Sequence, residues 1–376
     1  GVRYSGACAA LTDFAESAGI PVAATQAGKS VMPEVHPNYV GSLGVTGSAA
    51  ANELAQRADV VLSVGSRLQD FTTGSNGLIR GQVLSLNVQL HDAIKHDAIT
   101  VVGDALVGLE TLGHALRGHH TCDAYQQEYA KLKREWDAAV DAVTVKPEGN
   151  ALPSDSAVIG AVNRNVPATT IAVGAAGSMP GELHKLWRTG AVDGYHMEYG
   201  FSCMGYEISA GIGVHMASPD RPNVVFAGDG SYLMMNSELA TAVMMGVSMT
   251  LIVTDNRGYG CINRLQVATG GAPFNNLLAD AHHEILPEID FAAHAASLGA
   301  RSQKVSSLDE LEEAVLAASG RAGVDVIVID TDPGPSTEAG GVWWDVAVPA
   351  VSDRAAVGSA YQNYVQGRKR QEKGDK

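Results

Sequence analysis

Short, almost uninterrupted apolar runs alternate with helical stretches along most of this 376-residue chain. The runs fall at residues 20–24, 58–66, 82–89, 98–104, 169–175, 223–229, 249–255 and 324–330. A strand that is apolar throughout needs cover on both faces, and parallel sheets with helices on either side give it that cover. The sequence therefore predicts an α/β protein.

The alternation breaks once, at residues 119–153, where a polar, charged helix is followed by proline and glycine breaks. We interpret this stretch as a linker helix. Since 376 residues exceed one ordinary core, we predict two doubly wound parallel-sheet domains, residues 1–118 and 154–340. Residues 341–376 are predicted as a tail with a surface helix and a frayed basic end. Ser307 and Glu310 form a capping box that predicts a helix start.

The chain opens with a glycine turn and a helix, in GVRYSGACAALTDFAESAGI. In an α/β fold such a helix normally follows a strand. We therefore expect that the first strand of the 1–118 domain precedes Gly1, in a longer protein.

The net charge and the cysteine spacing limit the kinds of partner and the cellular compartment that are expected for this protein. A net charge of −15 disfavours nucleic acid and anionic membranes, which both need a basic face, so a small-molecule partner is expected. Cys8, Cys122, Cys203 and Cys261 show no metal-binding spacing, as expected for reduced thiols in a cytoplasmic protein. No apolar run is long enough to cross a bilayer.

The strongest chemical signal is AGDGSYLMMNSELATAVMMGVSMTLIVTDNRGYG, residues 227–260. One predicted strand ends at Asp229, a helix crosses over, and the next strand ends just before Asn256. The 27 residues between these two positions match one crossover unit, so both side chains should meet beyond the carboxyl ends of the strands. Neighbouring strands lie about 4.8 Å apart, so one small cation can bridge the pair.

The residue types also select the ligand. An Asp carboxylate, an Asn amide oxygen and a backbone carbonyl are hard donors that suit Mg²⁺ or Ca²⁺. Gly228 and Gly230 allow close approach of the backbone to a diphosphate, and Ser231 offers a hydroxyl and an N–H at a helix start.

The combination of GDG, this gap and Asn resembles the signature of thiamine-diphosphate-dependent enzymes. GDG alone is weak, since many tight turns contain it. The resemblance implies thiamine diphosphate as cofactor and a Mg²⁺ ion held by Asp229, the Asn256 side chain and the Gly258 carbonyl.

Two other segments carry the same resemblance. Residues 199–217 resemble the segment beneath the cofactor, where Met204 would prop the thiazolium, and its N–H with the Ser202 carbonyl would hold the aminopyrimidine. The alternative for Met204 is a core filler. Residues 173–181 resemble the loop that caps the diphosphate, which implies roles for Gly177 and Ser178. His184, His196 and Glu198 could face substrate, although a structural role is the simpler interpretation for each.

The resemblance covers nearly the whole chain. Residues 1–118 resemble the central, nucleotide-domain-like module of the acetolactate-synthase group, and residues 154–340 resemble the diphosphate-binding module. The stretches AGSMPGELHKLW, EYGFSCMGYEI, GDGSYLMMNSELATA and DNRGYGCINRLQ resemble a hydrolase branch of the family. That branch cleaves a ring C–C bond of a cyclic 1,2-diketone to a deoxy-glucuronic acid in myo-inositol catabolism.

The resemblance also implies what this chain lacks. In the family a glutamate on an N-terminal pyrimidine-binding module activates the cofactor, and we expect that module to be absent from residues 1–376. Because the family builds its site between subunits, a homodimer or homotetramer is expected. Two alternatives stay open: an acetolactate-synthase-like carboligase, and a non-catalytic binding or regulatory subunit.

Overall fold

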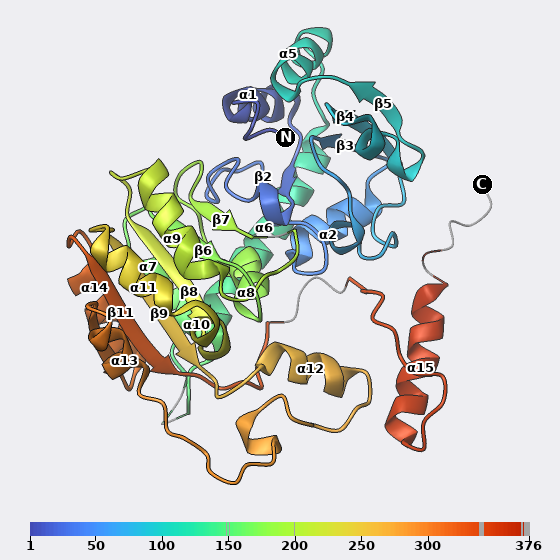
Figure 1. The fold of residues 1–376 in the computed structure, drawn as a ribbon. Helices are drawn as coiled ribbons and strands as arrows, with labels where there is room; N and C mark the ends of the chain where they lie inside the picture. The colour runs from blue at the N-terminus through green and yellow to red at the C-terminus, as the bar shows by residue number, and fades with distance from the viewer. Residues whose placement is uncertain (148, 150, 199, 338–341, 370, 372–376) are drawn as a thin grey trace.

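The computed structural model describes residues 1–147, 149, 151–198, 200–337, 342–369 and 371. Its strands form parallel sheets with helices on both faces (Figure 1), and this confirms the predicted α/β class. Every predicted run contains a strand, although most strands are one to four residues shorter than the run. Three further strands, described below, were not predicted.

The larger sheet has six parallel strands in the order β10-β11-β9-β8-β6-β7. Their bounds are β6 Ile171–Gly174, β7 Tyr195–Met197, β8 Asn223–Gly228, β9 Met249–Asp255, β10 Arg301–Val305 and β11 Val324–Asp330. The three central strands β11, β9 and β8 are almost wholly buried. This burial explains why their sequences are apolar without alternation.

Two hydrophobic cores lie on opposite faces of this sheet. Successive residues of a strand point to opposite faces, so Val224 and Phe226 belong to one core and Val225 and Ala227 to the other. The first core is covered by α7 Asp155–Arg164, α8 Met179–Leu186 and α14 Leu308–Ala318. The second is covered by α9 Tyr206–Ala217, α11 Ser237–Met244 and α13 Phe291–Ser297.

The chain reverses its direction across this sheet between β6 and β8. From β6 it passes outward to β7, then returns to the other side of β6 as β8 and continues to β9. In doubly wound sheets, such a switch point opens a crevice beyond the carboxyl ends of the strands, and ligands bind there. The loops after β6, β8 and β9 therefore surround the expected binding position.

The first part of the chain contains two smaller parallel sheets. One pairs β1 Val22–Ala24 with β2 Tyr39–Ser42, and the other has the order β3-β4-β5, with bounds Val60–Val64, Gln82–Asn87 and Ile99–Val102. The helices here are α1 Cys8–Ala18, α2 Ala49–Arg57, α3 Asp70–Thr73, α4 Leu90–Ala93 and α5 Ala105–Ala115. Short 3₁₀ turns lie at Gln26–Gly28 and Lys95–Asp97.

The predicted linker helix is α6, Asp123–Val143, and it packs against both parts of the molecule. Its Tyr129 is buried with Val40 and Leu54 of the first part. Its Trp136 and Val140 belong to the core beneath the six-stranded sheet. The helix therefore joins the two parts, while the boundaries at residues 118 and 153 stay predictions.

Buried polar contacts also connect the two parts. The Gln26 side chain donates to the Pro180 carbonyl at 3.1 Å and accepts from the Tyr195 hydroxyl at 2.8 Å. The Thr46 hydroxyl lies 2.9 Å from Nδ1 of the fully buried His184. Buried hydrogen bonds of this kind are costly to leave unmade, so they fix how the two parts meet.

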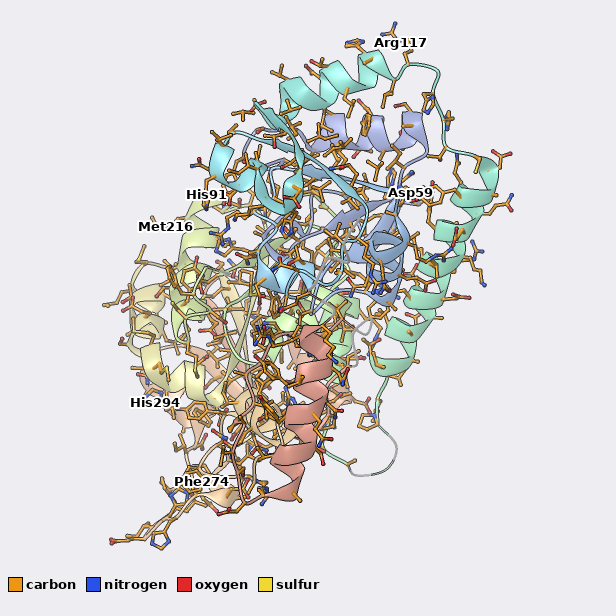
Figure 2. All side chains as sticks on the ribbon, turned by 90° about the vertical axis from the view of Figure 1, so that its right-hand side faces the viewer. Asp59, His91, Arg117, Met216, Phe274 and His294 are labelled. Carbon is orange, nitrogen blue, oxygen red and sulfur yellow. The ribbon has the colours of Figure 1, made fainter. Side chains whose placement is uncertain are left out.

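The last part of the chain returns to the first. After α12 Gly260–Ala268 and the 3₁₀ turn Leu278–Asp280, the chain completes the six-stranded sheet and ends with α15 Ala355–Arg368. In the segment between β11 and α15, the Trp344 indole N–H donates a hydrogen bond to the Asp70 carboxylate at 2.9 Å. Figure 2 places Arg117, just after α5, and Phe274, after α12, at opposite ends of the molecule. Part of the predicted basic end lies outside the described residues.

Across the described ranges, no helix is long and apolar enough to cross a membrane.

Candidate functional site

Asp229 and Asn256 meet at the carboxyl ends of two paired strands. β8 ends at Gly228, and α10 (Asp229–Met235) begins at the next residue. Because Gly228 pairs with Thr254 of β9, Asp229 lies beside the end of β9, which Asn256 follows directly. The Gly258 N–H donates to Oδ2 of Asp229 at 2.9 Å. The structure thus places Asp229 beside Gly258 and at the strand end that Asn256 follows, and for Asp229 and Asn256 this is the arrangement that the crossover spacing predicts.

Two oxygens at this position lack hydrogen-bond partners. Oδ1 of Asp229 and Oδ1 of Asn256 are both buried, and neither contacts a donor among the described residues. A buried acceptor without a partner costs about 1–3 kcal/mol, and more when it is charged. Carboxylate and amide oxygens are the ligand types that a hard cation such as Mg²⁺ prefers. The donor chemistry therefore fits the implied metal.

The electrostatics favour the same conclusion. Burial, and then the nearby Asp255 carboxylate, raises the pKa of Asp229 to about 7. A divalent cation is the strongest local charge a site can hold, and it stabilises the carboxylate form. Within the described ranges no group of three or more His, Cys, Asp or Glu side chains is placed to hold a metal.

Glycines leave room around the Asp229 turn. A side chain added at Gly228 would meet no atom within 4 Å, and the same holds for Gly177, whose φ is +85°. Gly258 differs, because its φ of +148° places an added Cβ 2.4 Å from the Asn276 carbonyl oxygen. Gly228 and Gly177 thus border open space, whereas Gly258 is required by the turn itself.

Met204 lies against the glycine-rich turn. A Cβ added at Gly230 would be 3.3 Å from the Met204 methyl and 2.7 Å from the Tyr259 ring. Met204 is half-buried in the turn before α9, which begins after Gly205 with φ +86°. A side chain seated in the turn beside a ligand site differs from an ordinary core filler, which would be enclosed. Its role toward the cofactor stays a prediction.

The remaining predicted residues border the same region. The Ser202 hydroxyl donates to the Ala175 carbonyl at 3.5 Å, which brings the Met204 turn to the loop after β6. In that loop the Ser178 hydroxyl donates to Oδ2 of the buried Asp155 at 2.6 Å. Ser178 can therefore donate its hydroxyl proton to a ligand only by giving up this bond, while the oxygen can still act as an acceptor.

Glu207 is a residue of this site whose role sequence reasoning missed. Its side chain is 1% exposed and accepts from the Ala176 N–H at 3.4 Å. Burial raises its pKa, and a hydrogen bond with the Ser231 side chain opposes that rise. Glu207 thus connects α9 to the segments after β6 and β8. The available signal was one carboxylate inside an otherwise apolar helix, YEISAGIGVHMA.

The three residues that could face substrate make structural contacts. His184 is fully buried between the two parts of the molecule. Nε2 of His196 lies 2.8 Å from the Tyr206 hydroxyl. Glu198 accepts from the N–H groups of Phe201 and Cys203 at 2.9 and 2.7 Å. Burial alone would raise the pKa of Glu198, but these bonds outweigh it and lower the pKa.

Comparison with known families agrees with this geometry. Residues 175–330 match the family described as thiamine pyrophosphate enzyme, C-terminal TPP binding domain. Residues 1–112 match the family described as thiamine pyrophosphate enzyme, central domain. The first match contains the loop after β6, the Met204 turn, Asp229 and Asn256, so the family resemblance and the geometry concern the same residues.

Curated relatives match almost the whole chain. The 3D-(3,5/4)-trihydroxycyclohexane-1,2-dione hydrolase of Geobacillus thermodenitrificans is 37% identical over an alignment 392 residues long, which covers 96% of this chain and 61% of the relative. The enzyme of the same name from Clostridium perfringens is 36% identical, over 96% of this chain and 62% of the relative. The chain thus spans about three fifths of the length of these relatives. It belongs to the thiamine pyrophosphate enzyme family, of which it carries the central domain and the C-terminal TPP-binding domain.

Proposed function

We propose that this chain is part of a thiamine-diphosphate- and Mg²⁺-dependent hydrolase that cleaves a C–C bond of a cyclic 1,2-diketone. The observation that carries the proposal is that Asp229 and Asn256, at the ends of β8 and β9, each have a buried oxygen without a partner among the described residues. The substrate comes from relatives that are named 3D-(3,5/4)-trihydroxycyclohexane-1,2-dione hydrolase. The expected product is 5-deoxy-glucuronate, in myo-inositol catabolism.

In this proposal Asp229, the Asn256 side chain and the Gly258 carbonyl hold Mg²⁺. Mg²⁺ prefers six oxygen ligands, so three protein oxygens leave positions for diphosphate oxygens and water. The open space at Gly228 and Gly177 accommodates the diphosphate. The N–H groups at the start of α10 can donate hydrogen bonds to its negatively charged oxygens. When bound, thiamine diphosphate supplies a nucleophilic carbon and an electron sink for breaking a bond next to a carbonyl.

The other residues of the chain hold the site in shape. Met204 supports the ring system from the α9 side, where its methyl already borders the Gly230 turn. Glu207 keeps the segments that carry Ala176 and Ser231 together. Asp155 does the same for the Ser178 loop through a bond of 2.6 Å. Positioning of this kind is what a site of several separate loops needs, because small displacements cost rate.

The cellular and quaternary setting is proposed on the same basis. We infer a cytoplasmic homodimer or homotetramer, with the activating glutamate supplied by a pyrimidine-binding module outside residues 1–376. The exposed methionines Met234 and Met235, which lie beside Gly205, support a covering partner, since exposed apolar groups of this size often mark interfaces.

The test is a product assay with the full-length protein that carries this chain. With Mg²⁺ and thiamine diphosphate, the cyclic diketone trihydroxycyclohexane-1,2-dione should give one open-chain acid per molecule consumed, as followed by NMR. Pyruvate should give no acetolactate. Acetolactate formation without ring opening would establish the carboligase instead, and cofactor binding without turnover of either substrate would favour a binding subunit.

A further inference from the structure

Two short backbone segments pair with each other beside the proposed cation site. One is the turn that follows β9, and the other is residues 276–278, which follow α12 and are called the clamp segment here. The Tyr259 N–H donates to the Asn276 carbonyl at 2.7 Å, and the Leu278 N–H donates to the Arg257 carbonyl at 2.9 Å. The clamp segment therefore holds the turn at two points, one on each side of the expected third ligand.

This pairing sets the direction of both polar groups of Gly258. The peptide bonds of the turn are trans, so the N–H and the C=O of one peptide unit point in opposite directions. The Arg257 carbonyl points to the clamp segment, so the Gly258 N–H points away from it and reaches Oδ2 of Asp229 at 2.9 Å. The Tyr259 N–H also points to the clamp segment. The Gly258 carbonyl must therefore point away from that segment as well, to the side on which Asp229 lies.

The two backbones approach each other closely. Gly258 and Leu277 are partners in an antiparallel β-bridge. With its φ of +148°, Gly258 would place an added Cβ 2.4 Å from the Asn276 carbonyl oxygen and 2.8 Å from the Leu277 Cα. Backbones come this close only where no side chain separates them. The glycine thus permits the pairing with the clamp segment as well as the turn.

Side-chain contacts anchor the clamp segment outside the turn. The Asn276 amide donates to Oε1 of Gln266, on α12, at 2.7 Å. Nε2 of His283 lies 3.0 Å from the Leu278 carbonyl oxygen. Because α12 begins directly after Tyr259, the turn and the clamp segment are the two paired ends of one loop. The pairing is therefore supported from α12 and from the residues that follow.

We propose that the clamp segment is a positioning element that directs the Gly258 carbonyl toward the cation held by Asp229. The inference rests on the proposed function, since it presupposes the Mg²⁺ site. A backbone carbonyl has no rotamer of its own, so its direction depends on the bonds of the peptide units around it. Mg²⁺ demands a near-ideal octahedron at about 2.0–2.1 Å, whereas Ca²⁺ accepts flexible geometry at about 2.3–2.6 Å. A misdirected carbonyl should therefore weaken Mg²⁺ binding more than Ca²⁺ binding.

Leu278→Pro tests the proposal by removing the N–H that bonds to Arg257. Leu278 is the first residue of a 3₁₀ turn and follows Leu277, whose backbone is extended, so proline fits the local conformation. In the full-length protein, calorimetric titration should show thiamine diphosphate binding weakened by about tenfold or more with Mg²⁺ and by less than about threefold with Ca²⁺. The conservative variant Leu278→Ala keeps the N–H and should bind as the wild type does with both ions.

A second variant decides the matter if Leu278→Pro does not fold. Replacing Leu278 by its α-hydroxy acid analogue turns the N–H into an ester oxygen with little change of shape, and it should give the same Mg²⁺-selective loss. In the cofactor-free protein, hydrogen exchange at the Gly258 and Tyr259 amides should become faster by about tenfold in this ester variant.

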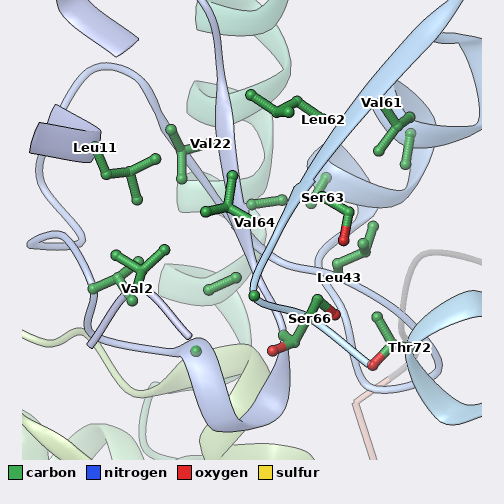
Figure 3. A pocket seen from close by; sticks show the side chains of 18 of the residues that line it. Val2, Leu11, Val22, Leu43, Val61, Leu62, Ser63, Val64, Ser66 and Thr72 are labelled. Carbon is green, nitrogen blue, oxygen red and sulfur yellow. The ribbon is translucent and has the colours of Figure 1, made fainter. Parts of the chain in front are cut away.

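A destabilising control separates positioning from a general loss of stability. Leu11 of α1 lines a cavity of about 500 Å³ whose lining residues lie between Gly1 and Tyr125, in the first part of the chain (Figure 3). Leu11→Ala should lower the thermal midpoint, because it removes buried apolar atoms. It should leave thiamine diphosphate binding unchanged with either ion.

The outcomes distinguish this proposal from the proposed function. Equal losses with Mg²⁺ and Ca²⁺, or wild-type Mg²⁺-dependent affinity in the ester variant, would overturn the positioning role and leave the proposed function in place. Absence of Mg²⁺-dependent binding in the wild type would overturn both.

Discussion

The Asp229 carboxylate and the Asn256 amide stand at the ends of adjacent parallel strands, and each has one buried oxygen without a partner among the described residues. The other carboxylate oxygen of Asp229 accepts from the Gly258 N–H. Both side chains thus follow the carboxyl ends of paired strands, and the hydrogen bond fixes Gly258, the third expected ligand residue, beside Asp229. This relationship is the physical basis for assigning the cation site.

Replacing Met204 should separate turnover from cofactor binding. In the full-length protein, Met204→Ala should lower kcat by about tenfold or more and change cofactor affinity less than about threefold. The reason is that Met204 borders the turn and is proposed to shape the bound cofactor without holding its diphosphate. Steady-state kinetics and titration calorimetry measure the two effects.

Met216→Ala is the control for this experiment, since Met216 lies on α9 but is 66% exposed. It should leave both quantities unchanged. Wild-type turnover in Met204→Ala would show that Met204 is only a packing residue.

Alanine substitutions at two glycines test whether the open space beside Asp229 holds the diphosphate. An added Cβ meets nothing within 4 Å at either Gly228 or Gly213. Gly228→Ala should fold normally but weaken cofactor binding by about tenfold, or about 1.4 kcal/mol, because the methyl group would occupy the proposed diphosphate position. Gly213→Ala, inside α9, should stabilise the protein by about 0.5–1 kcal/mol without changing affinity. Calorimetry that found equal affinities for the two variants would remove the diphosphate from this position.

His184 should make the protein sensitive to acid. Burial is the main cause that lowers its pKa from 6.5 to about 3. Between pH 6.5 and pH 3, His184 is protonated in the unfolded chain but neutral in the folded protein. The free energy of unfolding therefore falls as the pH falls toward 3. The loss is about 2 kcal/mol between pH 6.5 and pH 5.

His184→Asn tests this prediction, because asparagine has no such titration and its amide can reach Thr46 as Nδ1 does. The free energy of unfolding in urea should fall less steeply between pH 6.5 and 5 in the variant than in the wild type. Parallel pH profiles would mean that His184 is protonated inside the fold.

Much of the fold follows from the sequence because the central strands are buried on both faces. β8, β9 and β11 are apolar throughout, which leaves little choice of structure. The predicted helix start is also confirmed, since the Ser307 hydroxyl accepts from the Glu310 N–H at 3.2 Å, while the Glu310 carboxylate accepts from the N–H of Ser306 instead of Ser307. Here local sequence and tertiary structure favour the same outcome.

The missed strands lack that signal. β10 is an edge strand with the sequence RSQKV and is largely exposed, so polar residues are tolerated there. β7 has only three residues, and β2 has four that follow a proline-rich loop. Strands this short or this polar form only because a neighbouring strand pairs with them, and no local pattern reports that.

Within the site, the proximity of residues in one crossover unit could be predicted, whereas hydrogen bonds between segments far apart in the sequence could not. The spacing of Asp229 and Asn256 reflects one crossover unit, so their proximity could be inferred. The bonds of Ser178 to Asp155 and of Glu207 to the Ala176 N–H join the loop after β6 to α7 and to α9. Only the assembled fold shows such partners, and they change what Ser178 can offer to a ligand.

The most direct test of the cation site is titration calorimetry of thiamine diphosphate, with and without Mg²⁺, on the wild-type protein and on variants of Asp229. Wild-type binding should require Mg²⁺. Asp229→Ala should abolish that binding, and Asp229→Asn, which keeps an acceptor for Gly258, should weaken it by at least about tenfold. Asp59→Asn, at an exposed position, should bind as the wild type does. Unchanged Mg²⁺-dependent affinity in Asp229→Ala would contradict the assignment of this site.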